Sequence, residues 1–184
     1  MPRLTKDEER INYICESNDF DPKTVYNLTK IMLEGYKARL SAERIPTMVM
    51  SEEEIKLEKQ TLRREFLKLM RKNPEKSRDE QGAFIFKAIK APWMWEKIIY
   101  LLEKVEDFRT TGPTYRLILE HAYFAKNPMS NDALPQVVRV SESAIDYRKR
   151  EAIKLFGIYI WEYCWRRENE DIAMGVVEKD SDES

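Results

Sequence analysis

The stretch from Ser130 to Arg167 constrains the fold of this chain more than any other part of the sequence. Pro135 is tolerated near the start of a short helix, where backbone amides have no partner within the helix. Ser141 can accept a hydrogen bond from an amide two or three residues later, so a second helix is predicted to begin there after a brief break. The apolar side of the first helix comes from three valines, Val137, Val138 and Val140.

The second helix is predicted to have two different faces. Its apolar residues recur at helical spacing and would pack inward; they are Ile145, Ala152, Ile153 and Phe156. The remaining surface is polar and largely cationic, and it consists of Asp146, Tyr147, Arg148, Lys149, Arg150 and Lys154. A cationic helix face can meet nucleic-acid phosphates. The alternative is that this face is only the solvated surface of a helix.

The segment VRVSESAIDYRKREAIKLF is similar to the pattern L-G-I-S-x-x-T-V-x-x-x-x-x-x-A-L-x-x-L of sigma-factor region four, and the two match without gaps. Ile145 takes the position of the buried aliphatic residue of the recognition helix, and Ala152 that of the small residue where helices approach. Arg139 stands where the family has glycine. Either Arg139 adopts a left-handed conformation at some cost, or the turn differs from that of the family. The turn positions fall on Val138, Val140 and Ser141.

This segment resembles the C-terminal domain of phage-encoded transcriptional regulators of the RinA and ArpU type, and the resemblance covers about a quarter of the chain. This resemblance implies a sequence-specific DNA-binding regulator that places the helix starting near Ser141 in the major groove of double-stranded DNA. Residues at positions that can meet base edges are Glu142, Ser143, Ala144, Asp146, Tyr147 and Arg150. Residues expected to hold phosphates are Arg139, Arg148, Lys149 and Lys154. Contact with RNA polymerase is left open.

Composition favours an all-α fold. The sequence has only 5 glycines among 184 residues, and helix-favouring Leu, Glu, Lys, Arg and Met dominate several long stretches. We expect an N-terminal helical bundle over residues 1–109, followed by the helix-turn-helix domain over residues 110–167 with an extended recognition helix. Residues 168–184 are expected to form an acidic, disordered tail. The net charge of the whole chain is only -1. Since the tail is acidic, the rest of the chain carries a net positive charge.

Two helix starts are visible before the helix-turn-helix. Asp21 and Pro22 precede an apolar stripe that is predicted to end at Pro46. Ser51 and Glu54 form a capping box ahead of a second amphipathic helix. Basic residues follow from Lys56 to Lys90, which leaves open either a DNA-backbone contact or a solvated helix face.

The densest apolar set lies between Phe84 and Phe108, and a helix within it is predicted to begin at Pro92. This set is expected to be core, with a surface for a second copy or a polymerase as the alternative. The recognition helix also runs on beyond Phe156 with apolar residues on nearly all sides. Such a helix must be covered, either by the same chain or by a second copy in a homodimer.

Several functions are disfavoured by what the sequence lacks. It contains no glycine-rich phosphate loop, nucleophile motif or cluster of metal ligands, so we expect no enzyme, cofactor or metal site. Cys15, Cys164 and His121 are assigned no chemistry. The polar start and the lack of a long uncharged apolar stretch predict a cytoplasmic protein without membrane contact.

Two alternative functions stay open. The small subunit of a phage packaging terminase also joins a helical DNA-binding domain to an oligomerisation helix. An α-helical adaptor that binds proteins through its apolar surfaces would not bind DNA at all.

Overall fold

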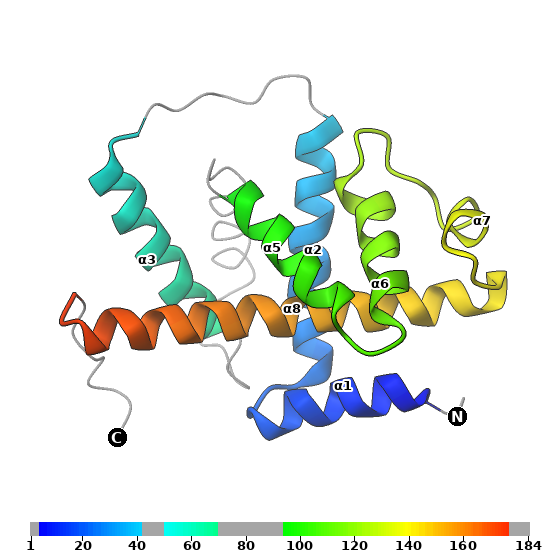
Figure 1. The fold of residues 1–184 in the computed structure, drawn as a ribbon, viewed down its shortest axis with the longest axis horizontal. Helices are drawn as coiled ribbons and strands as arrows, with labels where there is room; N and C mark the ends of the chain where they lie inside the picture. Colours follow the sequence, from blue (N-terminus) through cyan, green and yellow to red (C-terminus); the bar gives the residue numbers. More distant parts are fainter. Residues whose placement is uncertain (1–3, 42–49, 70–93, 177–184) are drawn as a thin grey trace.

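The chain folds into an all-α structure, seen here in a computed structural model that describes residues 4–41, 50–69 and 94–176. No strand occurs within those ranges. Figure 1 shows the arrangement, in which the long final helix runs across the molecule and the other helices pack around it. The helices are α1 (Lys6–Ser17), α2 (Pro22–Ser41), α3 (Glu52–Leu69), α5 (Met94–Glu106), α6 (Gly112–Leu119), the π-helical turn η1 (Glu120–Phe124), α7 (Leu134–Val138) and α8 (Glu142–Ala173).

Two predicted helix starts are confirmed by their caps. The Asp21 carboxylate accepts hydrogen bonds from the amide and the hydroxyl of Thr24 at 2.9 and 2.8 Å. At α3 the capping box is complete, since the Glu54 amide donates to the Ser51 hydroxyl at 3.2 Å and the Ser51 amide to the Glu54 carboxylate at 2.8 Å. The predicted start at Pro92 and the basic residues beyond Leu69 lie outside the described residues.

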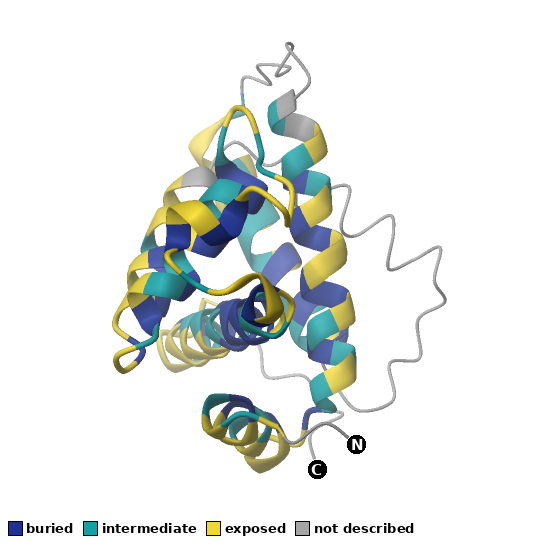
Figure 2. Cartoon of the chain, turned by 90° about the vertical axis from the view of Figure 1, so that its right-hand side faces the viewer, coloured by how far each residue is buried: buried dark blue, intermediate teal, exposed yellow. Residues whose placement is uncertain are grey.

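α8 is the centre of the core. It packs against α1, α2, α3, α5 and α6, and α2 crosses it at a steep angle (Figure 1). Figure 2 shows the buried residues of the surrounding helices turned toward it. One hydrophobic cluster joins residues on both sides of position 109, for example Leu33 and Val105 with Tyr115 and Phe156, each at most 1% exposed.

The apolar extension of the recognition helix is covered by the chain itself. Ile158, Ile160 and Cys164 are at most 6% exposed. Phe20 packs edge-on against Trp161, with ring centroids 4.7 Å apart. Of the two predicted ways to cover this segment, burial by the same chain is therefore the one observed. Trp165 stays exposed.

The first part of the predicted acidic tail is helical. Residues 168–173 belong to α8, and Asp171 is buried in an ion pair with Arg63 of α3. The prediction of disorder from residue 168 was wrong because a buried cation on a distant helix pairs with this carboxylate. Residues 177–184 lie outside the described residues.

The apolar set that was predicted to be core is mostly buried where it lies on α5, and α6 packs beside it. Ile98 and Val105 are 1% and 0% exposed, and Tyr115 and Ile118 are both fully buried. Ile99, which belongs to the same apolar set, is 42% exposed because it lies on the outer side of α5, and Leu117 of α6 is 37% exposed.

Both cysteines are buried thiols, and this predicts their reactivity. Burial raises the pKa of Cys15 to about 11 and that of Cys164 to about 12. A neutral thiol without solvent access is a poor nucleophile. We expect neither cysteine to react with dithionitrobenzoate at pH 8 until denaturant unfolds the chain, when both react. Rapid reaction of one thiol in the folded protein would contradict the packing of its helix.

Candidate nucleic-acid interface

α7 and α8 are joined by a three-residue connection, Arg139 to Ser141. Arg139 has φ 55° and ψ 45°, the left-handed conformation. Two alternatives were left open for Arg139, a left-handed conformation or a turn that differs from that of the family. The structure shows the left-handed conformation. The turn is closed by the Val140 amide, which donates to the Pro135 carbonyl at 3.3 Å.

The prediction that the Ser141 side chain caps α8 is wrong. Ser141 precedes α8 in an extended conformation, but its side chain makes no capping hydrogen bond. Its hydroxyl lies 3.2 Å from the hydroxyl of Ser143, and its backbone carbonyl accepts the Ala144 amide at 2.9 Å. The helix therefore begins at the predicted place, although the hydroxyl is engaged by a neighbouring serine.

Seven of the predicted site residues form one accessible surface, which we call the outer face. Tyr147 is half-buried within it and the others are exposed. On α8 these positions repeat at helical spacing, so they share one side of its first turns. The outer face consists of Arg139, Ser141, Glu142, Ser143, Asp146, Tyr147 and Arg150.

Lys149 borders the outer face but is tied to the loop before α7. Its ammonium donates to the side-chain oxygen of Asn131 at 2.8 Å, and the amide nitrogen of Asn131 donates to Asp146 at 2.8 Å. The ammonium also lies 5.0 Å from the centre of the Tyr123 ring. Burial lowers the pKa of Lys149. These contacts hold the loop against α8.

Two predicted contact residues are not at the surface. Ala144 is 6% exposed, so it cannot meet a base edge in this conformation. Lys154 is 5% exposed, and its ammonium donates to Glu8 at 2.9 Å and to Asn12 at 2.8 Å. The prediction that Lys154 holds a phosphate is corrected because α1 covers this turn of α8 and supplies its partners.

Arg148 is also directed toward α1 and the core. Its guanidinium donates to Glu151 at 3.0 Å, and to Asp7 and the Tyr115 hydroxyl at 3.3 Å each. Glu151 is fully buried, so Arg148 supplies the countercharge that this carboxylate needs. Arg148, for which a phosphate contact was predicted, is thus paired within the chain.

The partners of Glu151 complete this network. The Tyr115 hydroxyl donates to Glu151 at 2.8 Å, and the Thr5 hydroxyl donates to it as well. Burial, followed by the hydrogen bond to Glu151, raises the pKa of Tyr115. The network joins the start of α1, α6 and α8 around one buried carboxylate.

The charge of the outer face is consequently balanced. Its cations are Arg139 and Arg150, and its acids are Glu142 and Asp146. Arg150 also lies 3.8 Å from Glu8 of α1. The surface of this helix is less cationic than predicted, because acids from α1 pair with its more buried cations.

The residues that sequence reasoning missed lie mainly on α1. Asp7, Glu8 and Asn12 approach α8 from residues more than a hundred positions away. A partial signal was present, since Glu8, Ile11 and Cys15 form a stripe at helical spacing and all three are buried. That stripe predicts which side of α1 packs, but it does not name the helix that it meets.

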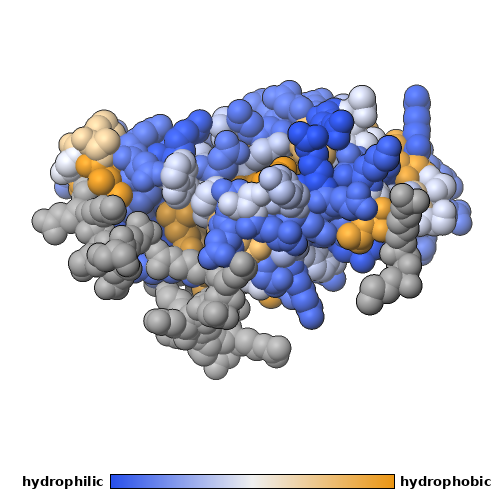
Figure 3. Space-filling model, turned by 90° about the horizontal axis from the view of Figure 1, so that it is seen from below, coloured by the Kyte–Doolittle hydropathy of each residue, from blue (hydrophilic) through white to orange (hydrophobic). Residues whose placement is uncertain are grey.

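Comparisons with family models, with curated proteins and with solved structures gave no match. Within the described ranges, no group of three or more residues could hold a metal ion. None of the described helices is long and apolar enough to cross a membrane. The side of the molecule seen in Figure 3 is mostly hydrophilic, with apolar areas separated from one another.

Proposed function

We propose that this chain is a sequence-specific DNA-binding protein of the transcriptional-regulator type, with the outer face turned toward the major groove. The observation that carries the proposal is the order of a short helix, a left-handed turn and a long helix whose first turns remain exposed. Glu142 to Arg150 spans about 12 Å of helix axis, which is enough to cross one major groove.

The contacts assigned to each residue follow from its exposure and chemistry. Arg139 and Arg150 are the exposed cations, so they are assigned to phosphates or to guanine. Tyr147 and Ser143 are assigned to base edges, and Asp146 can accept from a cytosine amino group. Arg148 and Lys154 are assigned to the internal network that holds α1 on α8.

The test uses variants of two outer-face residues that leave the hydrogen bonds of Glu151 and Lys154 in place, although Arg150 lies 3.8 Å from Glu8. The parent, Arg150→Ala and Tyr147→Ala would be compared for binding to pooled duplex fragments over a salt series. Arg150→Ala should weaken binding and reduce the slope of log affinity against log salt by about one. Tyr147→Ala should reduce the preference for the enriched sequence over random duplex, because it removes a base contact.

Arg166→Ala is the matched control. Arg166 lies on the same helix, and its side chain is 52% exposed against 49% for Arg150. It should bind DNA like the parent. Absence of duplex binding at low salt, or equal behaviour of all three variants, would contradict the proposal and favour the adaptor function.

A further inference from the structure

Asn131, in the loop between η1 and α7, joins two side chains of α8. Its amide nitrogen donates to the Asp146 carboxylate at 2.8 Å, and its side-chain oxygen accepts from the Lys149 ammonium at 2.8 Å. An ionised carboxylate can only accept and an ammonium can only donate, so the two contacts fix which way the amide is turned. Asp146 and Lys149 are i, i+3 neighbours of opposite charge, yet each hydrogen-bonds to Asn131 instead of to the other.

The loop that carries Asn131 is tied down on both sides of it. Before it, the Met129 amide donates to the His121 carbonyl of η1 at 2.8 Å. After it, the Ala133 amide donates to the Ser130 carbonyl at 3.1 Å and closes a turn around Asn131. The side chain of Asn131 is therefore presented to α8 from a fixed place.

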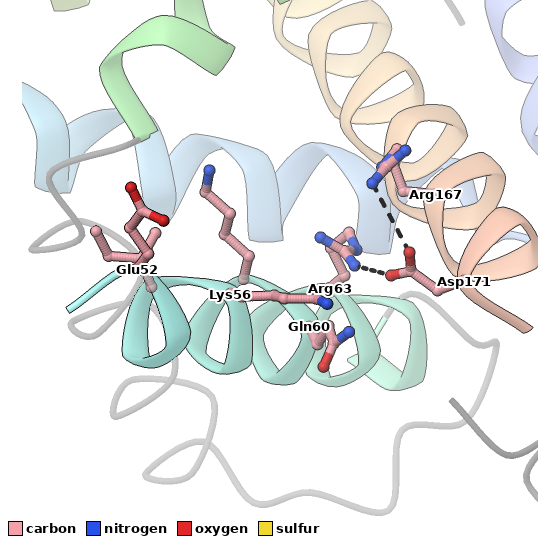
Figure 4. Close-up of a pocket in the computed structure, with 8 residues that line it drawn as sticks. Glu52, Lys56, Gln60, Arg63, Arg167 and Asp171 are labelled. Carbon is pink, nitrogen blue, oxygen red and sulfur yellow. Dashed lines mark hydrogen bonds and ion pairs between the residues drawn. The ribbon is translucent and has the colours of Figure 1, made fainter. Parts of the chain in front are cut away.

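α8 itself is anchored near both of its ends. Figure 4 shows Arg63 of α3 and Arg167 converging on Asp171 near the C-terminal end. Near the N-terminal end, the Lys149 ammonium lies 5.0 Å from the centre of the buried Tyr123 ring. The helix thus has a fixed position, and the direction of an outer-face side chain depends on the contacts of that side chain.

Asp146 keeps one carboxylate oxygen for a ligand. Oδ1 accepts from Asn131, and no hydrogen bond to Oδ2 occurs among the residues that the structure describes. Asp146 is exposed and belongs to the outer face. A carboxylate in the major groove accepts from the cytosine amino group, whereas guanine presents only acceptors there. The bridge therefore leaves the outer face with one acceptor on a carboxylate whose other oxygen is held.

We propose that Asn131 is a positioning residue that sets the base preference of Asp146. By holding Oδ1 it limits rotation of the carboxylate, and by binding Lys149 it keeps this cation from pairing with Asp146 directly. Without Asn131 the carboxylate gains rotamers and a competing ammonium about one turn away, so its contact with cytosine weakens. Asn131 acts only through an outer face that binds DNA, so this inference rests on the proposed function.

The test is selection of bound duplexes from a pool with randomised positions, followed by sequencing. The parent defines the preferred sequence, and Asp146→Ala identifies the base pair that Asp146 reads as the position at which the preference is lost. Asn131→Ala should lower the preference for cytosine at that position by about fivefold, the equivalent of one hydrogen bond, and leave the other positions unchanged. Asn131→Asp keeps an acceptor for Lys149 but cannot donate to Asp146, so it should have the same effect.

Asn127→Ala is the matched control, because Asn127 is an exposed asparagine of the same loop that takes no part in the bridge. It should select the same sequence as the parent. In the Asp146→Ala background, Asn131→Ala should have no further effect on the preference, because the residue it positions is gone. Asn131 is exposed, so its variants should keep the parent's circular dichroism spectrum.

An unchanged preference in Asn131→Ala, or weaker binding to all duplexes alike, would overturn the inference, since the second result marks a purely structural role. Asp146→Ala with no loss of preference at any position would overturn it as well. If Arg150→Ala and Tyr147→Ala still behave as expected, the DNA-binding function survives either result. A parent that binds no duplex at low salt would instead overturn the DNA-binding function and this inference together.

Discussion

Glu8→Ala should lower the free energy of unfolding by about 3–5 kcal/mol at neutral pH. Glu8 and Lys154 are 6% and 5% exposed, and their charged atoms lie 2.9 Å apart. Removing the carboxylate leaves the ammonium buried, with Asn12 as its one remaining hydrogen-bond partner among the described residues. Urea denaturation followed by circular dichroism measures the loss.

The control is the neighbouring Glu9→Ala. Glu9 is an exposed acid in the same first turn of α1, so its removal should change stability by no more than about 0.5 kcal/mol. Replacing both partners, Glu8→Leu with Lys154→Met, should restore most of the lost stability because no buried charge is left alone. A Glu8→Ala variant as stable as Glu9→Ala would show that α1 does not seal this pair from solvent.

The parts of the fold that could be predicted are those that depend on interactions between residues close together in the sequence. The starts of α2 and α3 follow from Asp21 and from Ser51 with Glu54, since each cap acts within three residues. The break at Arg139 and the restart at Ser141 were likewise visible. Local hydrogen bonding decides these features, so a single sequence contains them.

The candidate site could be predicted only in part, because exposure depends on distant partners. The sequence places Arg148, Arg150 and Lys154 in the same cationic run, yet Arg150 is exposed and Lys154 is buried. The difference comes from α1, whose Glu8 and Asp7 pair with residues about 140 positions away. The extent of α8 past residue 167 depends in the same way on Arg63. No helical periodicity specifies such pairings.

Gly157 of α8 packs directly against Val25 and Thr29 of α2, and this gives the second large effect. A Cβ at this position would overlap the Thr29 hydroxyl and lie 3.1 Å from Val25 Cγ1 and 3.2 Å from Thr29 Cβ. We expect Gly157→Ala to lower the free energy of unfolding by about 1–3 kcal/mol. The loss should appear although alanine is favoured over glycine within a helix by about 1 kcal/mol.

A double-mutant cycle with Thr29→Ala separates these two contributions. Thr29 is fully buried, and its hydroxyl has no hydrogen-bond partner within the described part of the chain, so its removal relieves the overlap. In the Thr29→Ala background, Gly157→Ala should be neutral or stabilising, because helix propensity then outweighs the two contacts that remain, with Val25 Cγ1 and with the Cβ at position 29. Denaturant unfolding of all four proteins measures the coupling. If Gly157→Ala lowered the free energy of unfolding equally in both backgrounds, the α2–α8 crossing would be wider than described. A direct contact between positions 29 and 157 requires that the effect of Gly157→Ala depend on the residue at position 29.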